Sequence, residues 1–171
     1  MKLLTLNFLT CAIKTCKTQA SSFPLHPKDS ELEIVEADIN LPFLKNILPR
    51  LMWEELRTIC KEVCPHARHY AFTKHHSLRY FATCANVYLQ LGLPDLPPAA
   101  PTPSDLVEGG LQETPEGQQA PDEEPSQTAK DLHRVLLETC IQEGKLVCGC
   151  CGHEYAVKEG VANFLLPGHL V

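Results

Sequence analysis

Two pairs of cysteines at opposite ends of the chain constrain its fold more than any other feature. Cys11 and Cys16 are separated by four residues. Cys148 and Cys151 are separated by two, and a glycine at 152 permits the left-handed backbone that lets the turn amides point at both sulfurs. Tetrahedral zinc takes four ligands, so one pair needs the other. The sequence therefore predicts a four-cysteine zinc site that joins the two ends of the chain.

Two alternatives for these cysteines stay open. Cys11 and Cys16 also suit a role as small buried hydrophobic side chains, which is a common fate of free cysteine. Cys150 offers a C-x-C pairing in place of Cys151, although C-x-x-C followed by Gly-His has the better geometry. We therefore leave Cys150 as a spare thiol and expect His153 to donate a hydrogen bond to a sulfur from outside the ligand set.

Cysteine usage and motif content favour a reduced, non-catalytic protein. The nine cysteines are an odd number, and the opening segment 1–16 has too interrupted an apolar run for a convincing signal peptide. Metal ligands are then more plausible than a disulfide framework. We expect no membrane association, because no stretch reaches the roughly 18 apolar residues of a membrane span. We expect no enzyme, because nucleotide-binding loops, nucleophile elbows and H-E-x-x-H are absent and four cysteines leave zinc no open position.

Hydrophobic spacing predicts an α+β fold with central helices. A strand is expected at 32–38. Asn40 and the proline at 42 are placed to begin a helix that Pro49 ends, and residues 53–60 continue with helical spacing.

A third helix and a terminal meander are expected further along the chain. Ser126 or Thr128 caps this helix, its apolar stripe extends to Cys140, and Gly144 lies where a C-terminal glycine belongs. Three antiparallel strands follow, at 145–148, 154–158 and 161–166.

These elements predict two domains. A zinc-ribbon-like domain with a small antiparallel sheet is expected from residues 1–40 and 144–171, and a helical domain from 41–143. Residues 101–128 contain seven acidic residues and no Lys or Arg, so we expect a disordered acidic linker there. Residues 60–85 follow neither periodicity and are treated as an insert of uncertain structure.

The insert 60–85 suggests two further hypotheses. It contains three cysteines and four histidines, a composition that would suit a second metal site, although no glycine turn frames them. It also contains basic and aromatic side chains that would suit RNA, although nothing in it resembles an RNA-recognition motif. A zinc-ribbon module that binds RNA directly is therefore the alternative function.

Three segments resemble one known protein family. The start MKLLTLNFLTCAIKTC, the central LPFLKNILPRLMWEEL and the ending CGHEYAVKEGVANFLLPGHLV are similar to the small zinc-binding activator subunit that eukaryotic methyltransferases share. The similarity is strongest for fungal members and covers about residues 1–59 and 86–171. It implies a zinc-binding domain built from both termini and a central helical domain.

The resemblance also implies a function. Members of this family are non-catalytic subunits that activate and stabilise several class I methyltransferases as heterodimers, in the cytoplasm and nucleus. The partners modify transfer RNA, ribosomal RNA and a translation release factor. The resemblance therefore implies that the partner, and not this chain, binds S-adenosylmethionine and RNA. The family's zinc ligands, which have a structural role, correspond to Cys11, Cys16, Cys148 and Cys151.

The apolar terminal strand is the expected partner surface. An exposed apolar edge strand is suited to pairing with another sheet while it shields an apolar patch. An ordinary core role is the alternative, because alternate residues of a strand face inward, and we expect about half of them to be available. The expected contact residues are Phe8, Val161, Asn163, Phe164, Leu165 and Leu166.

Overall fold

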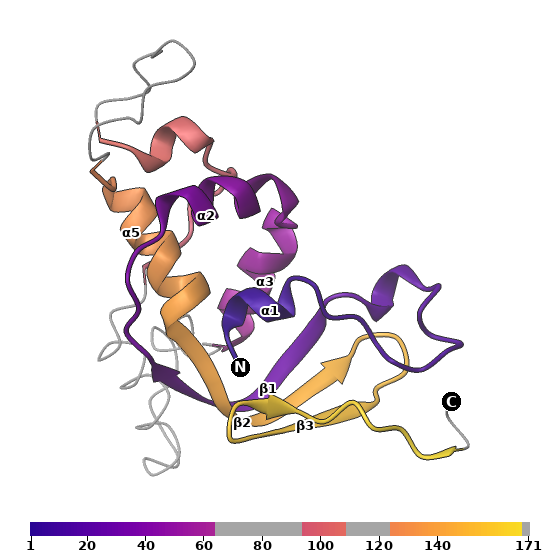
Figure 1. Ribbon diagram of the computed structural model, residues 1–171. Helices are drawn as coiled ribbons and strands as arrows, with labels where there is room; N and C mark the ends of the chain where they lie inside the picture. The colour runs from indigo at the N-terminus through magenta and orange to yellow at the C-terminus, as the bar shows by residue number, and fades with distance from the viewer. Residues whose placement is uncertain (64–93, 109–123, 169–171) are drawn as a thin grey trace, which may run out of the picture.

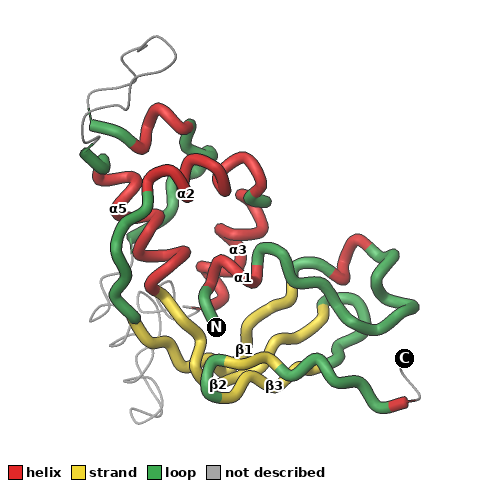
Figure 2. The backbone as a smooth tube through the Cα atoms, viewed as in Figure 1, coloured by secondary structure: helices red, strands yellow, loops and turns green. Residues whose placement is uncertain are grey.

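The computed structural model describes residues 1–63, 94–108 and 124–168 (Figure 1). Most of the insert expected at 60–85 and the middle of the expected acidic linker lie outside these residues. The described chain forms a four-stranded antiparallel sheet with the helices gathered on one side of it (Figure 2). The α+β class predicted from the sequence is therefore confirmed.

The sheet joins an N-terminal strand to the C-terminal meander. Its strands are β1 (Leu25–Ile34), β2 (Thr139–Cys148), β3 (Glu154–Lys158) and β4 (Val161–Ala162), in the order β1-β2-β3-β4. β1 pairs with β2 from Leu25 opposite Cys148 to Ile34 opposite Thr139. This pairing brings the segment that contains the first two cysteines beside the turn that contains the last ones.

The described residues also form short helices, besides a single turn at residues 20–22 and a π-helical turn after the last of them. They are α1 (Leu3–Leu6), α2 (Leu41–Ile47), η2 (Leu48–Arg50), α3 (Trp53–Val63), η4 (Pro103–Leu106) and α5 (Gln127–His133). The Asn40 side chain accepts a hydrogen bond from the Phe43 amide at 2.9 Å, and Ser126 caps α5 through the Ala129 amide at 3.2 Å. The first residues of α2 and α5 agree with the caps expected from the sequence. Of the two caps expected for α5, Ser126 or Thr128, the structure shows Ser126.

The third helix ends earlier than the sequence predicted. α5 gives way to a π-helical turn, η5 (Arg134–Glu138), and β2 begins at Thr139. Cys140 therefore lies in a strand and not on a helical stripe. Gly144 does not end a helix: at φ +139° it lies inside β2, where a Cβ would be 2.9 Å from the Ser30 Cα. Close approach of two strands, and not a helix terminus, requires glycine at this position.

Two other expected boundaries are wrong, and the expected acidic linker is described only at its two ends. The strand placed at 32–38 is β1 at Leu25–Ile34, because pairing with β2 selects a more polar segment that contains Pro27. β4 ends at Ala162 and not at 166. The segment expected to be a disordered linker is ordered at its edge, where Leu106 is fully buried and Val107 bridges Pro125.

Buried side chains form two clusters that meet across the helices. One cluster joins α1, the first cysteine loop and the inner face of the sheet, with Leu6, Leu146 and Tyr155 among its members. The other joins α2, α3, η4 and α5 around Leu44 and Leu56. The sheet-side cluster also includes Ile59 and Val135, which come from the segment expected to form the helical domain, so both expected domains contribute to it. The division into two domains stays a prediction.

Candidate metal centre and apolar edge

Four cysteine sulfurs converge at one end of the sheet. The Cys11 and Cys151 sulfurs are 3.7 Å apart, and the Cys16 and Cys148 sulfurs are 3.5 Å apart. All four sulfurs lie within 4.8 Å of one another. A tetrahedral zinc ion with bonds of about 2.3 Å needs sulfurs about 3.8 Å apart. The four thiols therefore fit a closed, tetrahedral soft-metal site.

Local backbone structure positions both pairs. The Cys11 amide donates to the Ser22 carbonyl at 3.1 Å, and the Cys16 amide closes a turn on the Ile13 carbonyl at 3.0 Å. The second pair lies on the turn after β2, where the Gly152 amide donates to the Cys148 carbonyl at 2.9 Å. Gly152 adopts φ +70° with no atom near the position of a Cβ, so glycine serves the backbone conformation, as expected.

The electrostatics of the site favour a thiolate at Cys148. Burial raises the pKa of this thiol, but the Cys151 and Cys150 backbone amides hydrogen-bond the sulfur, and the net pKa is lowered to about 7. The Cys150 amide nitrogen lies 3.4 Å from this sulfur. Burial and the neighbouring thiols raise the pKa of Cys16. A metal ion would supply the positive charge that four thiolates in this space need.

Tyr155 supports the site in a way that the sequence did not reveal. Its buried hydroxyl accepts a hydrogen bond from the Ala12 amide at 2.9 Å and lies 3.1 Å from the Cys11 sulfur. Burial and the adjacent Cys11 raise the pKa of Tyr155 to about 12, so the phenol keeps its proton, and a metal-bound thiolate at Cys11 would accept it in a hydrogen bond. The alternation of side chains along β3 indicates only that Tyr155 faces inward, and it does not indicate that the hydroxyl meets Cys11.

Two other expectations concern the turn residues. The His153 ring packs edge-on against Tyr155 with ring centroids 4.7 Å apart, and its backbone carbonyl accepts from the Cys148 amide at 3.0 Å. Its contribution to the site is therefore made by packing and backbone and not by a ring donor. Cys150 is exposed and lies outside the four-sulfur group, as expected of a spare thiol.

The terminal segment 161–166 alternates between outward and inward residues. Val161 is 68% exposed and Leu165 is 87% exposed, and Asn163 faces outward between them. The intervening residues pack on the sheet-side core, with the Phe164 ring 4.7 Å from the Tyr155 ring. Three of the six predicted contact residues, Val161, Asn163 and Leu165, are therefore exposed at this edge. Phe164 and Leu166 are partly buried.

The N-terminal contact residue is also exposed. Phe8 follows α1 and is 49% exposed. The adjacent Asn7 is buried, and its side-chain amide donates to the Met52 carbonyl at 2.9 Å and accepts from the Met52 amide at 2.8 Å. These bonds fix the backbone beside Phe8 to the loop before α3.

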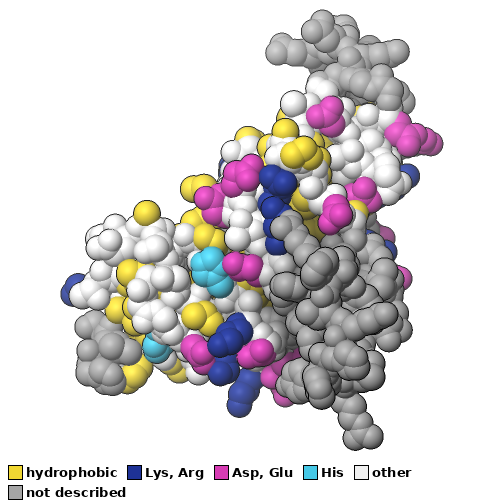
Figure 3. Space-filling model, turned by 180° about the vertical axis from the view of Figure 1, so that it is seen from behind, with side chains coloured by type: hydrophobic (Ala, Val, Ile, Leu, Met, Phe, Trp, Pro, Cys, Tyr) yellow, Lys and Arg dark blue, Asp and Glu magenta, His cyan; other side chains and the backbone are white. Residues whose placement is uncertain are grey.

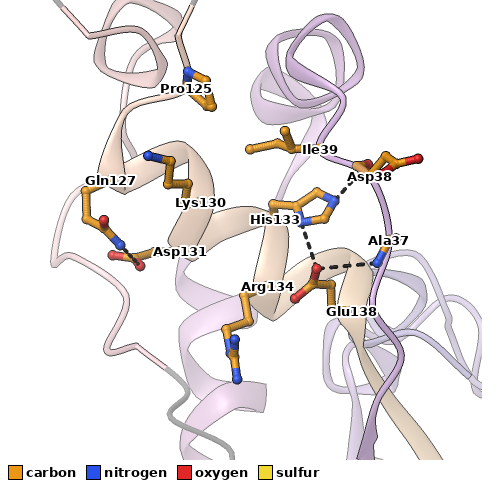
Figure 4. A pocket seen from close by; sticks show the side chains of 10 residues that line it. All are labelled: Ala37, Asp38, Ile39, Pro125, Gln127, Lys130, Asp131, His133, Arg134 and Glu138. Carbon is orange, nitrogen blue, oxygen red and sulfur yellow. Dashed lines mark hydrogen bonds and ion pairs between the residues drawn. The ribbon is translucent and has the colours of Figure 1, made fainter.

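A polar hollow of about 400 Å³ lies away from the cysteines, between α5 and the segment 37–39 (Figure 4). The His133 Nε2 lies 3.2 Å from the Asp38 carbonyl oxygen, and its Nδ1 lies 3.4 Å from Glu138. The Glu138 carboxylate also accepts from the Ala37 amide. These contacts tie the segment that leaves β1 to the end of the helix, which is a structural role.

The fold and the site define a small sheet-and-helix protein whose four-thiol centre is closed from both ends of the chain. A family model described as "Trm112p-like protein" matches residues 2–160, and the chain belongs to that family.

Relatives match over the whole chain. It is 44% identical to the multifunctional methyltransferase subunit trm112 of Neurospora crassa over 171 residues, which is all of both proteins. It is 33% identical to TRM112 of Saccharomyces cerevisiae over 175 residues, again all of both. It is 35% identical to trm112 of Schizosaccharomyces pombe over 166 residues, 97% of this chain and 96% of that protein.

Proposed function

We propose that this chain is a non-catalytic subunit that binds, stabilises and activates methyltransferases dependent on S-adenosylmethionine. The similarity along the full chain to relatives named multifunctional methyltransferase subunits carries this proposal. The word multifunctional in those names supports several partners and not one. Among the described residues, no helix is long and apolar enough to cross a membrane.

The proposed metal is zinc in a structural role. Cys11, Cys16, Cys148 and Cys151 would hold it, and the donor set of four sulfurs is the one that zinc favours in closed sites. A bound zinc ion would cross-link the two ends of the chain and neutralise the thiolates. The protein then supplies the shape of the terminal sheet, and Tyr155 and the turn amides orient the sulfurs.

The proposed partner surface is the apolar edge next to that centre. β4 is the edge strand of the described sheet, and Val161 and Leu165 project from this edge to solvent. An exposed edge with outward apolar side chains suits addition of a strand from the partner, with backbone hydrogen bonds for affinity and side-chain pockets for specificity. Phe8 and Asn163 are proposed as further contacts, whereas Phe164 and Leu166 support the edge from beneath.

The finer proposal follows the family resemblance. The partners are class I methyltransferases, each bound as a heterodimer, that modify transfer RNA, ribosomal RNA and a translation release factor in the cytoplasm and nucleus. RNA and S-adenosylmethionine bind the partner. Basic and acidic side chains are interspersed over the described part of the face in Figure 3, which favours indirect over direct RNA contact.

Co-expression with such methyltransferases tests the proposal. The wild-type chain should raise the soluble yield of each partner and co-purify with it. Leu165→Asp should abolish co-purification, because a carboxylate would be buried at the edge, while its zinc content stays equal to that of wild type. Phe43→Asp is the matched control, since Phe43 is also an exposed apolar side chain, at 38%, but lies on α2 and not among the proposed contacts.

Two results would contradict the proposal. Partners that remain as insoluble with the wild-type chain as without it would refute activation by stabilisation. RNA binding by the isolated chain, with a salt dependence that implies several phosphate contacts, would favour the alternative of a direct RNA-binding module.

A further inference from the structure

A proline-rich segment lies against α3 without joining a helix or a strand. Residues 94–102 contain prolines at 94, 97, 98 and 101, which form two P-x-x-P repeats. Proline fixes φ at about −65°, lacks an amide hydrogen and holds the residue before it in an extended backbone. The carbonyls of such a segment are not used in a helix or a sheet, so they remain available as acceptors. This is the backbone chemistry of the proline-rich ligands that dock in aromatic-lined grooves.

Trp53 and Arg57 bind two successive carbonyls of this segment. The Trp53 indole Nε1 donates to the Pro97 carbonyl at 3.2 Å, and the Arg57 guanidinium donates to the Pro98 carbonyl at 3.2 Å. The two donors are four residues apart on α3, so they share one face of the helix. Because both contacts are made to main-chain atoms, they recognise the extended backbone and not a particular side chain. A tryptophan beside a guanidinium therefore forms a site suited to reading proline-rich chains.

The chain holds this segment through few contacts. Leu96 is only partly buried, where it packs against both core clusters, and Asp95 and Pro98 are exposed. Among the described residues, the buried Nε of Arg57 meets no acceptor, so the segment leaves one donor of the site unused. A segment with few buried contacts belongs to the part of a structure that opens most readily. It is therefore open to replacement by a ligand of the same chemistry.

We propose that this face of α3 binds proline-rich peptides of partner proteins, and that residues 96–98 occupy it until such a peptide displaces them. The chain's own segment is tethered beside the site, so it competes at an effective concentration on the order of millimolar. A free peptide therefore binds weakly while the segment is in place and more tightly once its hold is weakened. Trp53 and Arg57 contribute the donors, and Leu96 marks the position that an apolar side chain of the ligand fills. The proposal depends neither on the metal nor on the terminal edge.

The single tryptophan of the chain makes the site observable, because its fluorescence reports directly on the indole of Trp53. The probe is a synthetic peptide of residues 94–103, PDLPPAAPTP, which contains no aromatic residue. In the full-length variant Pro97→Gly/Pro98→Gly the segment loses two fixed φ angles, which should weaken its hold roughly tenfold. The emission of this variant should shift to longer wavelength as water reaches the indole. The peptide should reverse that shift with a Kd roughly fivefold or more below that for wild type.

Three controls separate recognition of this backbone from unspecific binding. The same peptide with its two central prolines changed to glycine should bind the variant roughly tenfold more weakly. Adding Arg57→Met to the variant keeps the aliphatic stem and removes the donors, so it should weaken peptide binding by about tenfold. Adding Lys61→Met instead, which is the same kind of change at an exposed position of α3, should leave the affinity unchanged.

Three results would overturn the proposal. They are absence of peptide binding by the Pro97→Gly/Pro98→Gly variant, equal affinity of the peptide for this variant and for wild type, and equal affinity of the variant for the proline and glycine peptides. The last comparison needs no further change in the protein, so it refutes or supports the site even where Arg57→Met does not fold.

Discussion

Tyr155→Phe removes one hydroxyl from the metal centre and leaves the packing almost unchanged. The ring keeps its contacts with His153 and Phe164, so the change is confined to the two groups that the hydroxyl meets. The Ala12 amide loses its acceptor at 2.9 Å, and the Cys11 sulfur loses a donor at 3.1 Å. Leaving a buried donor unpaired costs roughly 1–3 kcal/mol.

The expected effects are measurable separately. A cost of about 2 kcal/mol lowers the melting temperature of a chain of this size by roughly 4–8 °C. Loss of the bond to the ligand sulfur should weaken zinc binding by about tenfold or more. Thermal unfolding of the zinc-loaded protein gives the first quantity, and competition with a chelator gives the second.

Thr58→Val is the control, because it removes a hydroxyl that donates to the Glu54 carbonyl on the exposed side of α3, far in sequence from the four proposed ligands. Its zinc affinity should equal that of wild type. If Tyr155→Phe also kept wild-type zinc affinity and melted within about one degree of wild type, the hydroxyl would not support the site and the reasoning would be refuted.

The remaining predictions concern other parts of the molecule. Cys148→Ser should abolish zinc binding and lower soluble yield and partner co-purification together, as metal analysis and size-exclusion chromatography would show. Phe164→Ala should cost roughly 2 kcal/mol in thermal unfolding, about half of a full core truncation because the ring is half-buried. Gly144→Ala should cost roughly 2–3 kcal/mol by the same measurement, because φ is +139° and the new Cβ would meet backbone at 2.9 Å. The Thr102 backbone amide and then its hydroxyl lower the pKa of Asp105, so this carboxylate stabilises the fold above its ordinary pKa and the contribution is lost as pH falls through the lowered value. Thr102→Ala should move that pKa back toward the ordinary one, which a carboxyl-carbon NMR titration would detect.

The local features of this fold were predictable from sequence because short-range chemistry decides them. Asn40 and Ser126 cap helices through amides three residues away, so each start depends only on neighbouring residues. The cysteine pairs were recognisable because ligand spacing and the glycine after Cys151 are local too. That the two pairs meet was an inference from the valence of zinc, and the structure places their sulfurs together.

The missed boundaries depend on partners distant in sequence. β1 contains a proline and several charged residues, and it is a strand because β2 lies beside it. The apolar spacing through Leu136 continues to Cys140, so no periodicity marks the change from helix to strand that the π-helical turn introduces. Tyr155 shows the same limit, since only the folded sheet places its hydroxyl at Cys11.

Because the metal centre takes ligands from both ends of the chain, it forms only late in the synthesis of the chain. Cys16 and Cys148 are 132 residues apart, so at ordinary translation rates of about 5–20 residues per second the first pair waits roughly 7–26 seconds for the second. β1 waits nearly as long for its partners on β2. A nascent or truncated chain therefore has two unmatched thiols and an unpaired strand, both signals that chaperones and proteases act on. Only a chain translated through Cys151 is able to complete the centre, so metal capture reports that synthesis has passed the last ligand, with only β3, β4 and the terminal segment still to follow.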